Sequence, residues 1–415
     1  MYPDGICQVR EGYYSKVVQY QDINYQLAQE DDKRAIFDKY CEFLNYFDSS
    51  IHIQLCFYNY SGRIEDYQVA IKIEEQKDAF NDIRQEYSQM LRNQLAKGNN
   101  GLIKNKYLVF GIEANDYRTA KTRLERIELD IFSHLRGLGA IAQSLNGAER
   151  LHVMHDLLNE SQHKFHFDWK RLKESGLATK DFIAPSGFDF TPTGSFGMGR
   201  KQAQVSYLQI MAPELSDELL KNFLILESDL AVTLHIQSIE QTAAIKMIKR
   251  KITDLDKMKI EEQKKAIRSG YDMDILPSDL VTYGAEAKTL LESLQSRNER
   301  LFLVTFLLMN IADNKRKLEN DYYQTAGIAQ SANCNLRPLD YQQERGLAAM
   351  LPLGINPVPI ERALTTSATA IFVPFTTQEL FQPAPALYYG LNALSNNLLR
   401  SEERRVGKEC RYRWS

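Results

Sequence analysis

KYLVFGIEANDYRTAKTRLERIE, residues 106–128, and LFLVTFLLMNIADNKRKLENDYY, residues 301–323, follow the same pattern. Each begins with an apolar run typical of a buried strand, continues through a turn with Ala, Asn and Asp, and ends in the basic start of a helix. Two such pairs in one chain indicate two copies of a strand-helix-strand-helix unit. Because amphipathic strand-helix units use few patterns, chance similarity remains an alternative.

The segments around these two stretches complete the units. In the first half we expect a hairpin over Ile6–Tyr25, a strand over Ser50–Tyr58 and helices over Gln29–Phe47, Glu74–Leu95 and Tyr117–Leu138. In the second half we expect strands over Leu230–Ile239 and Arg300–Ile311 and helices over Glu240–Ser269 and Asn314–Gln324. The predicted fold class is α+β, with two consecutive ferredoxin-like units whose long amphipathic helices pack on one face of each sheet.

Changes in composition divide the chain. The first α+β unit is expected at 1–173 and the second at 201–351, with a Gly-, Pro- and Ser-rich loop or linker at 174–200. Residues 352–399 are expected to be a connection, and 400–415 read as a non-native tail because no apolar period ties them to what precedes.

The segment at 330–353 is expected to be buried. Cys334 and Leu336 alternate as in a strand, and a helix is predicted from Asp340 to Met350 with Asp340 as its cap. Leu347 lies on the apolar face of that helix.

Composition is that of an ordinary globular protein. The 415 residues are 44% hydrophobic and 25% charged, which excludes wholesale disorder, and the formal net charge of -3 points to no particular partner.

Five cysteines without a CxxC pair indicate free thiols in a reducing compartment. The N-terminus lacks a secretion signal, and Leu301–Met309 is too short to cross a bilayer. We therefore expect a cytoplasmic protein, or one peripheral to the cytoplasmic face of a membrane.

Four histidines in one stretch form the strongest candidate for metal binding. His152 and His155, then His163 and His166, are each spaced three apart, so each pair shares a helix face and offers two imidazole ligands. The competing interpretation places the first pair as exposed residues flanking the core face of a helix. Since no cysteine or HExxH motif accompanies them, no metal site is assigned.

Two other patterns suggest contact with phosphate. Gly194–Lys201 (GSFGMGRK) departs from a P-loop because Arg200 stands where Lys is needed and Gln202 where Ser or Thr is needed, so a flexible linker is predicted. The helix at 240–269 carries many Lys and Arg residues that can contact DNA or anionic lipid. Acidic residues interrupt them, which favours a solvated, salt-bridged face. No catalytic residue is assigned.

Several segments in order resemble the N-terminal region of type IV secretion conjugal transfer ATPases of the VirB/TrbE type, as found in Gram-positive conjugative elements. They include DINYQLAQEDDK (22–33), NKYLVFGIEANDY (105–117), LNGAERLHVMHDLLN (145–159), QSANCNLRPLDYQQERGLAAMLPLGIN (330–356) and YYGLNALSNN (388–397). Together they span nearly all of residues 1–399.

The resemblance implies a scaffold that leads into a RecA-like domain binding ATP and Mg²⁺. No GxxxxGK[ST] occurs here, so no cofactor-binding residue is carried over, and this chain alone is expected neither to bind ATP tightly nor to hydrolyse it. The resemblance also implies other secretion components as partners, self-association and membrane-surface contact, without sequence-specific nucleic-acid binding. The alternatives are a non-enzymatic interaction module of the same apparatus or, third, a metal-binding protein.

Overall fold

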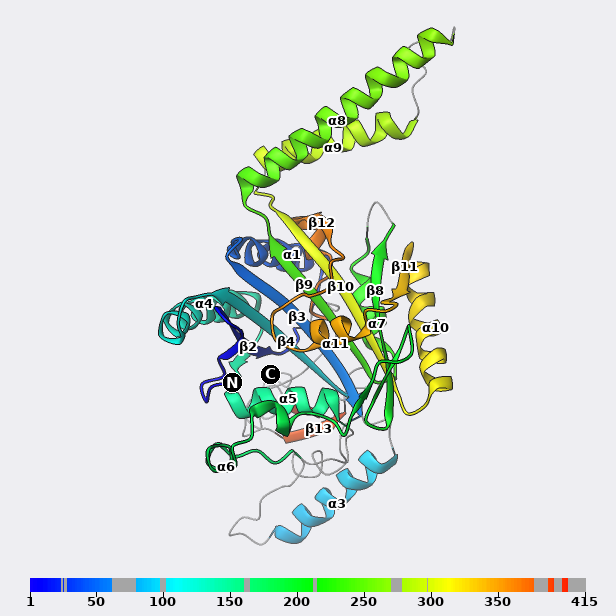
Figure 1. Ribbon diagram of the computed structural model, residues 1–415. Coiled ribbons are helices and arrows are strands. Elements are labelled where there is room, and N and C mark those ends of the chain that lie inside the picture. Colours follow the sequence, from blue (N-terminus) through cyan, green and yellow to red (C-terminus); the bar gives the residue numbers. More distant parts are fainter. Residues whose placement is uncertain are drawn as a thin grey trace, which may run out of the picture.

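The computed structural model describes residues 1–376 except 24, 26–27, 62–79, 98–101, 160–164, 212–214, 270–277 and 297, and also 387–391 and 398–401. These residues form a mixed α/β structure around a large antiparallel sheet (Figure 1). The predicted combination of helices and strands is therefore confirmed.

Most elements of the first half match the sequence expectations, although β5 was not predicted and residues 74–79 of the helix expected over Glu74–Leu95 lie outside the described residues. Its strands are β1 (Cys7–Arg10), β2 (Tyr13–Tyr20), β3 (Ile51–Ser61), β4 (Leu102–Glu113) and β5 (Ala142–Ser144). Its helices are α1 (Glu30–Tyr46), α3 (Asn81–Lys97), α4 (Tyr117–Leu138) and α5 (Gly147–Leu158). The bounds of α4 have a local cause: the Asp116 carboxylate accepts from Thr119 N–H at the start, and Gly139 ends the helix at a φ of 89°.

The second half begins with short elements. These are α6 (Trp169–Ser175), a 3₁₀ turn at Thr179–Phe182, β6 (Phe188–Asp189) and β7 (Phe196–Met198). The main elements are β8 (Lys201–Ile210), α7 (Glu218–Ile225), β9 (Leu230–Ser238), α8 (Gln241–Arg268), α9 (Ser278–Ser296), β10 (Leu301–Ala312), α10 (Lys315–Ser331), β11 (Cys334–Pro338) and α11 (Gln343–Met350). After them come β12 (Arg362–Thr365), α12 (Thr366–Ala370), β13 (Leu387–Leu391) and β14 (Leu398–Ser401).

The two halves repeat one topology. Four strands of the first half lie in the order β5-β2-β4-β3, and four of the second lie in the order β11-β8-β10-β9, with each of these pairings antiparallel. Counted in chain order, a helix follows the first and the third of these strands in each half. These helices are α1 after β2 and α4 after β4, then α7 after β8 and α10 after β10. The halves join where β3 pairs with β9, with Leu55 opposite Leu234, so one sheet runs through both.

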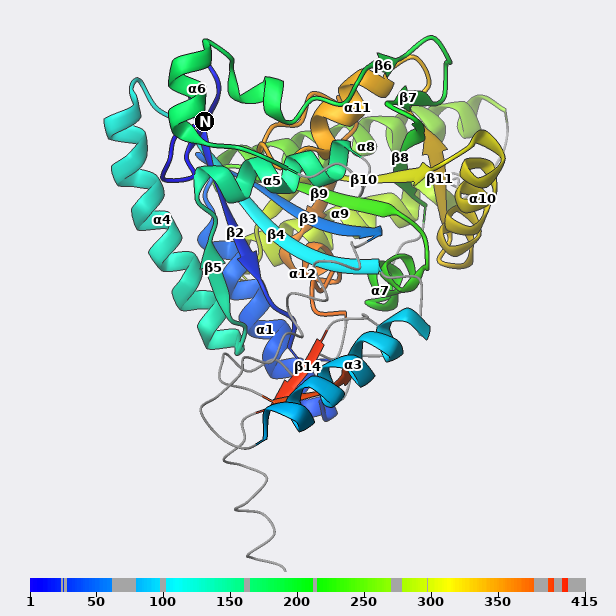
Figure 2. The same ribbon diagram turned by 90° about the horizontal axis from the view of Figure 1, so that it is seen from below.

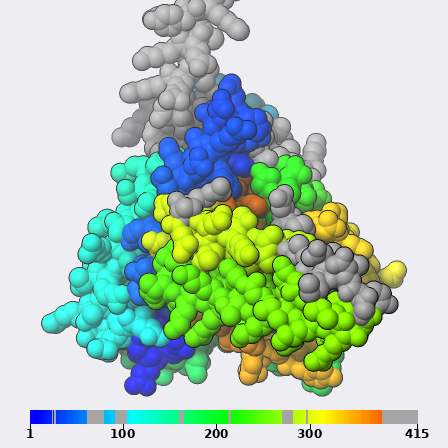
Figure 3. All heavy atoms as spheres, turned by 90° about the horizontal axis from the view of Figure 1, so that it is seen from above, coloured from blue at the N-terminus to red at the C-terminus, as the bar shows by residue number. Residues whose placement is uncertain are grey.

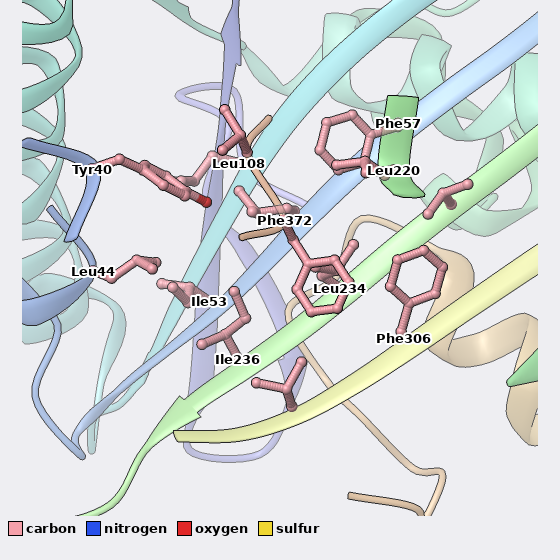
Figure 4. Packing of buried hydrophobic residues seen from close by; sticks show 14 of the residues in the cluster. Tyr40, Leu44, Ile53, Phe57, Leu108, Leu220, Leu234, Ile236, Phe306 and Phe372 are labelled. Carbon is pink, nitrogen blue, oxygen red and sulfur yellow. The ribbon is translucent and has the colours of Figure 1, made fainter. Parts of the chain in front are cut away.

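Helices cover both faces of this sheet (Figure 2). Alternate residues of β3 show why: Ile53 and Phe57 pack in one apolar cluster, whereas Cys56 and Tyr58 pack in another. The first cluster includes residues of α1, α4, α7, α10 and α12, and Figure 4 shows Tyr40 and Leu44 of α1 and Leu220 of α7 within it. The second cluster includes residues of α5 and α11. The prediction of helices on one face only is wrong, because these strands are apolar on both faces.

A helical arm projects from the second half (Figure 1). It consists of α8 and α9, which lie between β9 and β10 and pack through Ala244, Ile248 and Leu294. In the first half, the corresponding connection between β3 and β4 carries α3. Among the helices of the described segments, none is long and apolar enough to cross a membrane.

Two local predictions need correction. Helix α11 begins at Gln343 rather than after Asp340, because Tyr341 has a φ of 59° and so cannot continue a helix; Gln342 is the cap residue, without a side-chain cap bond. Gly194–Lys201 is not a flexible linker, because β7 pairs with β8 through a turn at Gly199, whose φ is 60°. Lys201 Nζ lies 2.8 Å from an Asp229 carboxylate oxygen, so this lysine is held in an ion pair.

Candidate functional site

Residues 349–361, here called the connecting segment, comprise the last two residues of α11 and the chain after it, and they are bonded to side chains of both halves. Their backbone carbonyls accept hydrogen bonds from Tyr58 OH (2.7 Å, to Met350), Arg150 Nη2 (2.8 Å, to Pro352), Tyr13 OH (2.5 Å, to Gly354), His235 Nε2 (2.9 Å, to Ala349) and Thr305 Oγ1 (2.6 Å, to Ile360). The donors come from β2, β3, α5, β9 and β10. The connecting segment is thus fixed to both sets of strands.

Gln54 of β3 also holds the connecting segment, both as a donor and as an acceptor of hydrogen bonds. Its Nε2 donates to the carbonyls of Ala349 and Leu351 at 3.0 and 2.9 Å, and its Oε1 accepts from Gly354 N–H at 2.7 Å. The residue is fully buried. A buried amide without hydrogen-bond partners lowers the stability of the fold. The side-chain amide of Gln54 and the backbone groups of the connecting segment therefore stabilise each other by forming these hydrogen bonds.

Arg150 of α5 anchors the connecting segment from the side. Its guanidinium is fully buried and donates to Ser15 Oγ and to the carbonyls of Gly5, Ser15 and Pro352 at 2.7–3.0 Å. A capping box of Asn146 and Glu149 sets the start of α5 and hence the position of this arginine. Sequence analysis did not select Arg150, although its place four residues before the buried Met154 puts it on the apolar face of the helix.

A pocket of about 250 Å³ lies between the connecting segment and the paired strands β3 and β9. Its polar lining is Arg10, Tyr13, His52, His235, Gln237, Asn356 and Glu361. Of these, Arg10 is positioned by Tyr13, since its guanidinium carbon lies 5.4 Å from the centroid of that ring. The pocket therefore forms at the junction of the two halves.

The two histidines of the pocket come from neighbouring strands. Burial lowers the pKa of both, and that of His235 falls to about 4. His235 is therefore neutral near pH 7 and donates through Nε2 to the Ala349 carbonyl. His52 packs edge-on against Tyr13, with ring centroids 5.6 Å apart.

We predict that His235 makes stability sensitive to acid. Its folded-state pKa of about 4 lies below the unfolded value of 6.5, so its contribution is complete above pH 6.5 and is lost as pH falls toward 4. The loss should reach about 3 kcal/mol. Urea denaturation from pH 7 to 4 measures it, and His235→Gln, which keeps a donor, should show a correspondingly shallower fall. His152→Gln, at a half-exposed position, is the control, and identical pH profiles for wild type and His235→Gln would contradict the prediction.

The polar groups of this pocket can hold a ligand through hydrogen bonds and charge. The described residues that line it include no Ser, Thr, Cys or Lys, so they supply no nucleophile of those types beside the histidines. The site offers neutral imidazoles, two side-chain amides, a guanidinium and a carboxylate, which can position a chain segment or a small polar ligand.

A second polar anchor lies on the opposite face. Lys106 of β4 pairs with Asp22, and its Nζ also donates to the Pro374 carbonyl at 2.9 Å, while Thr376 N–H donates to Asp22 at 3.1 Å. Phe372 and Phe375 pack in the apolar cluster beside α1. From the end of α11 onward, the chain is thus bonded to one face at 349–361 and to the other at 374–376.

The described members of the four candidate histidines do not form a metal site. His152 is half-exposed and His155 is buried, contrary to the expectation that both would be exposed; both rings pack on Phe165. His166 is exposed, and His163 lies outside the described residues. Within the described parts of the chain, no group of three or more His, Cys, Asp or Glu side chains is arranged to hold a metal ion.

The described cysteines Cys7, Cys41, Cys56 and Cys334 are free thiols. Burial raises the pKa of Cys56 to about 12, so this thiol stays protonated near pH 7.

No model of a known protein family matches the chain, and neither does any curated protein.

Proposed function

We propose that this chain is the N-terminal scaffold of an ATPase that energises conjugative transfer of DNA or protein through a type IV secretion system. The ordered resemblance of its segments to the VirB/TrbE-type ATPases supports this proposal. In the proposed full protein, a RecA-like domain after the scaffold binds ATP and Mg²⁺ and self-associates at the cytoplasmic face of the membrane, in contact with other secretion components.

The finer fold assignment belongs to the same proposal. We propose that each half is a ferredoxin-like unit, since each has a strand-helix-strand-strand-helix-strand order with the fourth strand beside the first and the third between the first and second. Insertions at α3 and at the arm account for the long connections between the second and third strands.

The attachment of the connecting segment is the structural observation that best supports a scaffold. Buried side chains of both halves hold residues 349–361, and the buried Lys106–Asp22 pair holds residues 374–376. A domain that follows such a segment has its starting point fixed relative to the sheet, as a motor that exerts force on its scaffold requires. The alternative is a non-enzymatic interaction module of the same apparatus, which the same rigid attachment would also serve.

The genomic reading frame after codon 399 separates these two functions. We expect the frame to continue into a GxxxxGK[ST] motif, and the purified longer protein to hydrolyse ATP with Mg²⁺. Replacing the motif lysine with alanine should abolish turnover, while the 415-residue chain should show none. A native stop codon near 399 would instead establish the module.

A further inference from the structure

Helix α8 carries a line of cations along the side that faces away from α9. At about 100° of rotation per residue, five basic positions fall within about 40° of one another around the helix axis. These residues, here called the basic row, are Lys246, Arg250, Lys257, Lys264 and Arg268. The row extends for about 33 Å at a rise of 1.5 Å per residue.

The row is accessible and only weakly neutralised. All five side chains are exposed, and Figure 3 looks onto the arm, across which α8 runs. Lys257 lies 3.4 Å from an Asp254 oxygen, but no other row member has a carboxylate partner among the described residues. No acidic residue of α8 falls within the row's range of about 40°; the nearest are Glu261 and Asp254, about 20° and 40° beyond one edge of it. The predicted salt-bridged face is therefore only partly formed.

The apolar residues of α8 argue against burial of this helix in a lipid surface. Ala244, Ile248 and Leu255 are buried, on the side toward α9 and opposite the basic row. The exposed apolar residues are divided: Met247 and Met258 lie on one flank of the row, and Ile260 and Ile267 on the other. A helix that lies in a bilayer interface instead needs one continuous apolar face.

We propose that the basic row binds the phosphate backbone of nucleic acid without reading its sequence. Five cations on one straight helix match a polymer that carries a negative charge about every 1.7 Å along a duplex axis. The projection of the arm from the sheet leaves this side of α8 open to a partner as large as a duplex (Figure 1). The whole chain has a formal net charge of -3 and supplies no general attraction, so binding depends on this local row.

The test uses the full 415-residue chain and fluorescein-labelled duplexes of about 30 base pairs in two unrelated sequences. Fluorescence anisotropy should give the same Kd for both duplexes, and affinity should fall at least about tenfold between about 50 and 200 mM salt. The row variant is Lys246→Glu, Arg250→Glu, Lys264→Glu and Arg268→Glu together. It should lose at least about tenfold in affinity relative to wild type.

A matched variant separates the row from net charge. Lys249→Glu, Lys251→Glu, Lys259→Glu and Lys265→Glu change the formal charge of α8 by the same amount at positions outside the row, and should change the Kd by less than about threefold. If circular dichroism shows that the row variant has lost helix, the same four positions replaced by Gln are judged by the same criterion. Equal losses in both variants, undetectable DNA binding by wild type, or binding only to phosphatidylserine vesicles would overturn the proposal.

Discussion

Replacing Lys106 with methionine is expected to lower the free energy of unfolding by about 3–5 kcal/mol. The side chains of Lys106 and Asp22 are 7% and 0% exposed, so the variant leaves a carboxylate buried without its cation. The loss also frees the Pro374 carbonyl and Thr376 hydroxyl that Lys106 Nζ contacts. Urea denaturation of wild type and variant at pH 7 measures the difference.

The control for this variant is Lys33→Met. Lys33 pairs with Glu30 at 3.1 Å, but Glu30 is 80% exposed, so the change should cost less than about 1 kcal/mol. The double variant Lys106→Met with Asp22→Asn should be more stable than Lys106→Met alone, because the stranded charge is gone. Equal denaturation midpoints for Lys106→Met and Lys33→Met would refute the structural role of the buried pair.

Leu347→Asp is the second substitution from which we expect a large effect. Leu347 is 6% exposed on α11, within the apolar cluster that contains Val205 and Leu339. An aspartate there loses apolar packing and buries a charge, which should cost about 3–5 kcal/mol of unfolding free energy. Equilibrium denaturation by urea at neutral pH is the measurement.

Tyr341→Asp provides the matched control for Leu347→Asp. It introduces the same carboxylate two residues before α11, at a side chain that is 85% exposed, and aspartate tolerates the positive φ of this position. We expect a change within about 0.5 kcal/mol. If both variants unfold at the same denaturant concentration as wild type, α11 is not part of the core.

Sequence alone predicted most helices and strands because their causes are local. The bounds predicted for the helix at Tyr117–Leu138 agree with α4, since a carboxylate cap precedes it and a glycine follows it. The pairing of β3 with β9 left no comparable signal, because any two apolar strands with alternating faces are compatible partners. The buried helix at 343–350 was also predictable, although its start was not.

The candidate site was hidden for a related reason. His235 and Gln54 lie in strands, and the sequence does not show which face of the sheet a polar strand residue occupies. Their partners are backbone carbonyls more than 100 positions away. Spacing rules detect clusters within one segment, so they selected His152 and His155 and missed the junction. Arg150 was missed as well, although its place on an apolar helix face was visible in the sequence.

The seam between β3 and β9 has the geometry of a two-fold symmetric dimer interface contained in one chain, because equivalent strands of the two halves meet antiparallel. Covalent linkage replaces a bimolecular association by an intramolecular one, so the seam closes at an effective concentration that dilution does not change. Either half produced alone would expose its seam strand as a bare sheet edge and would self-associate through it.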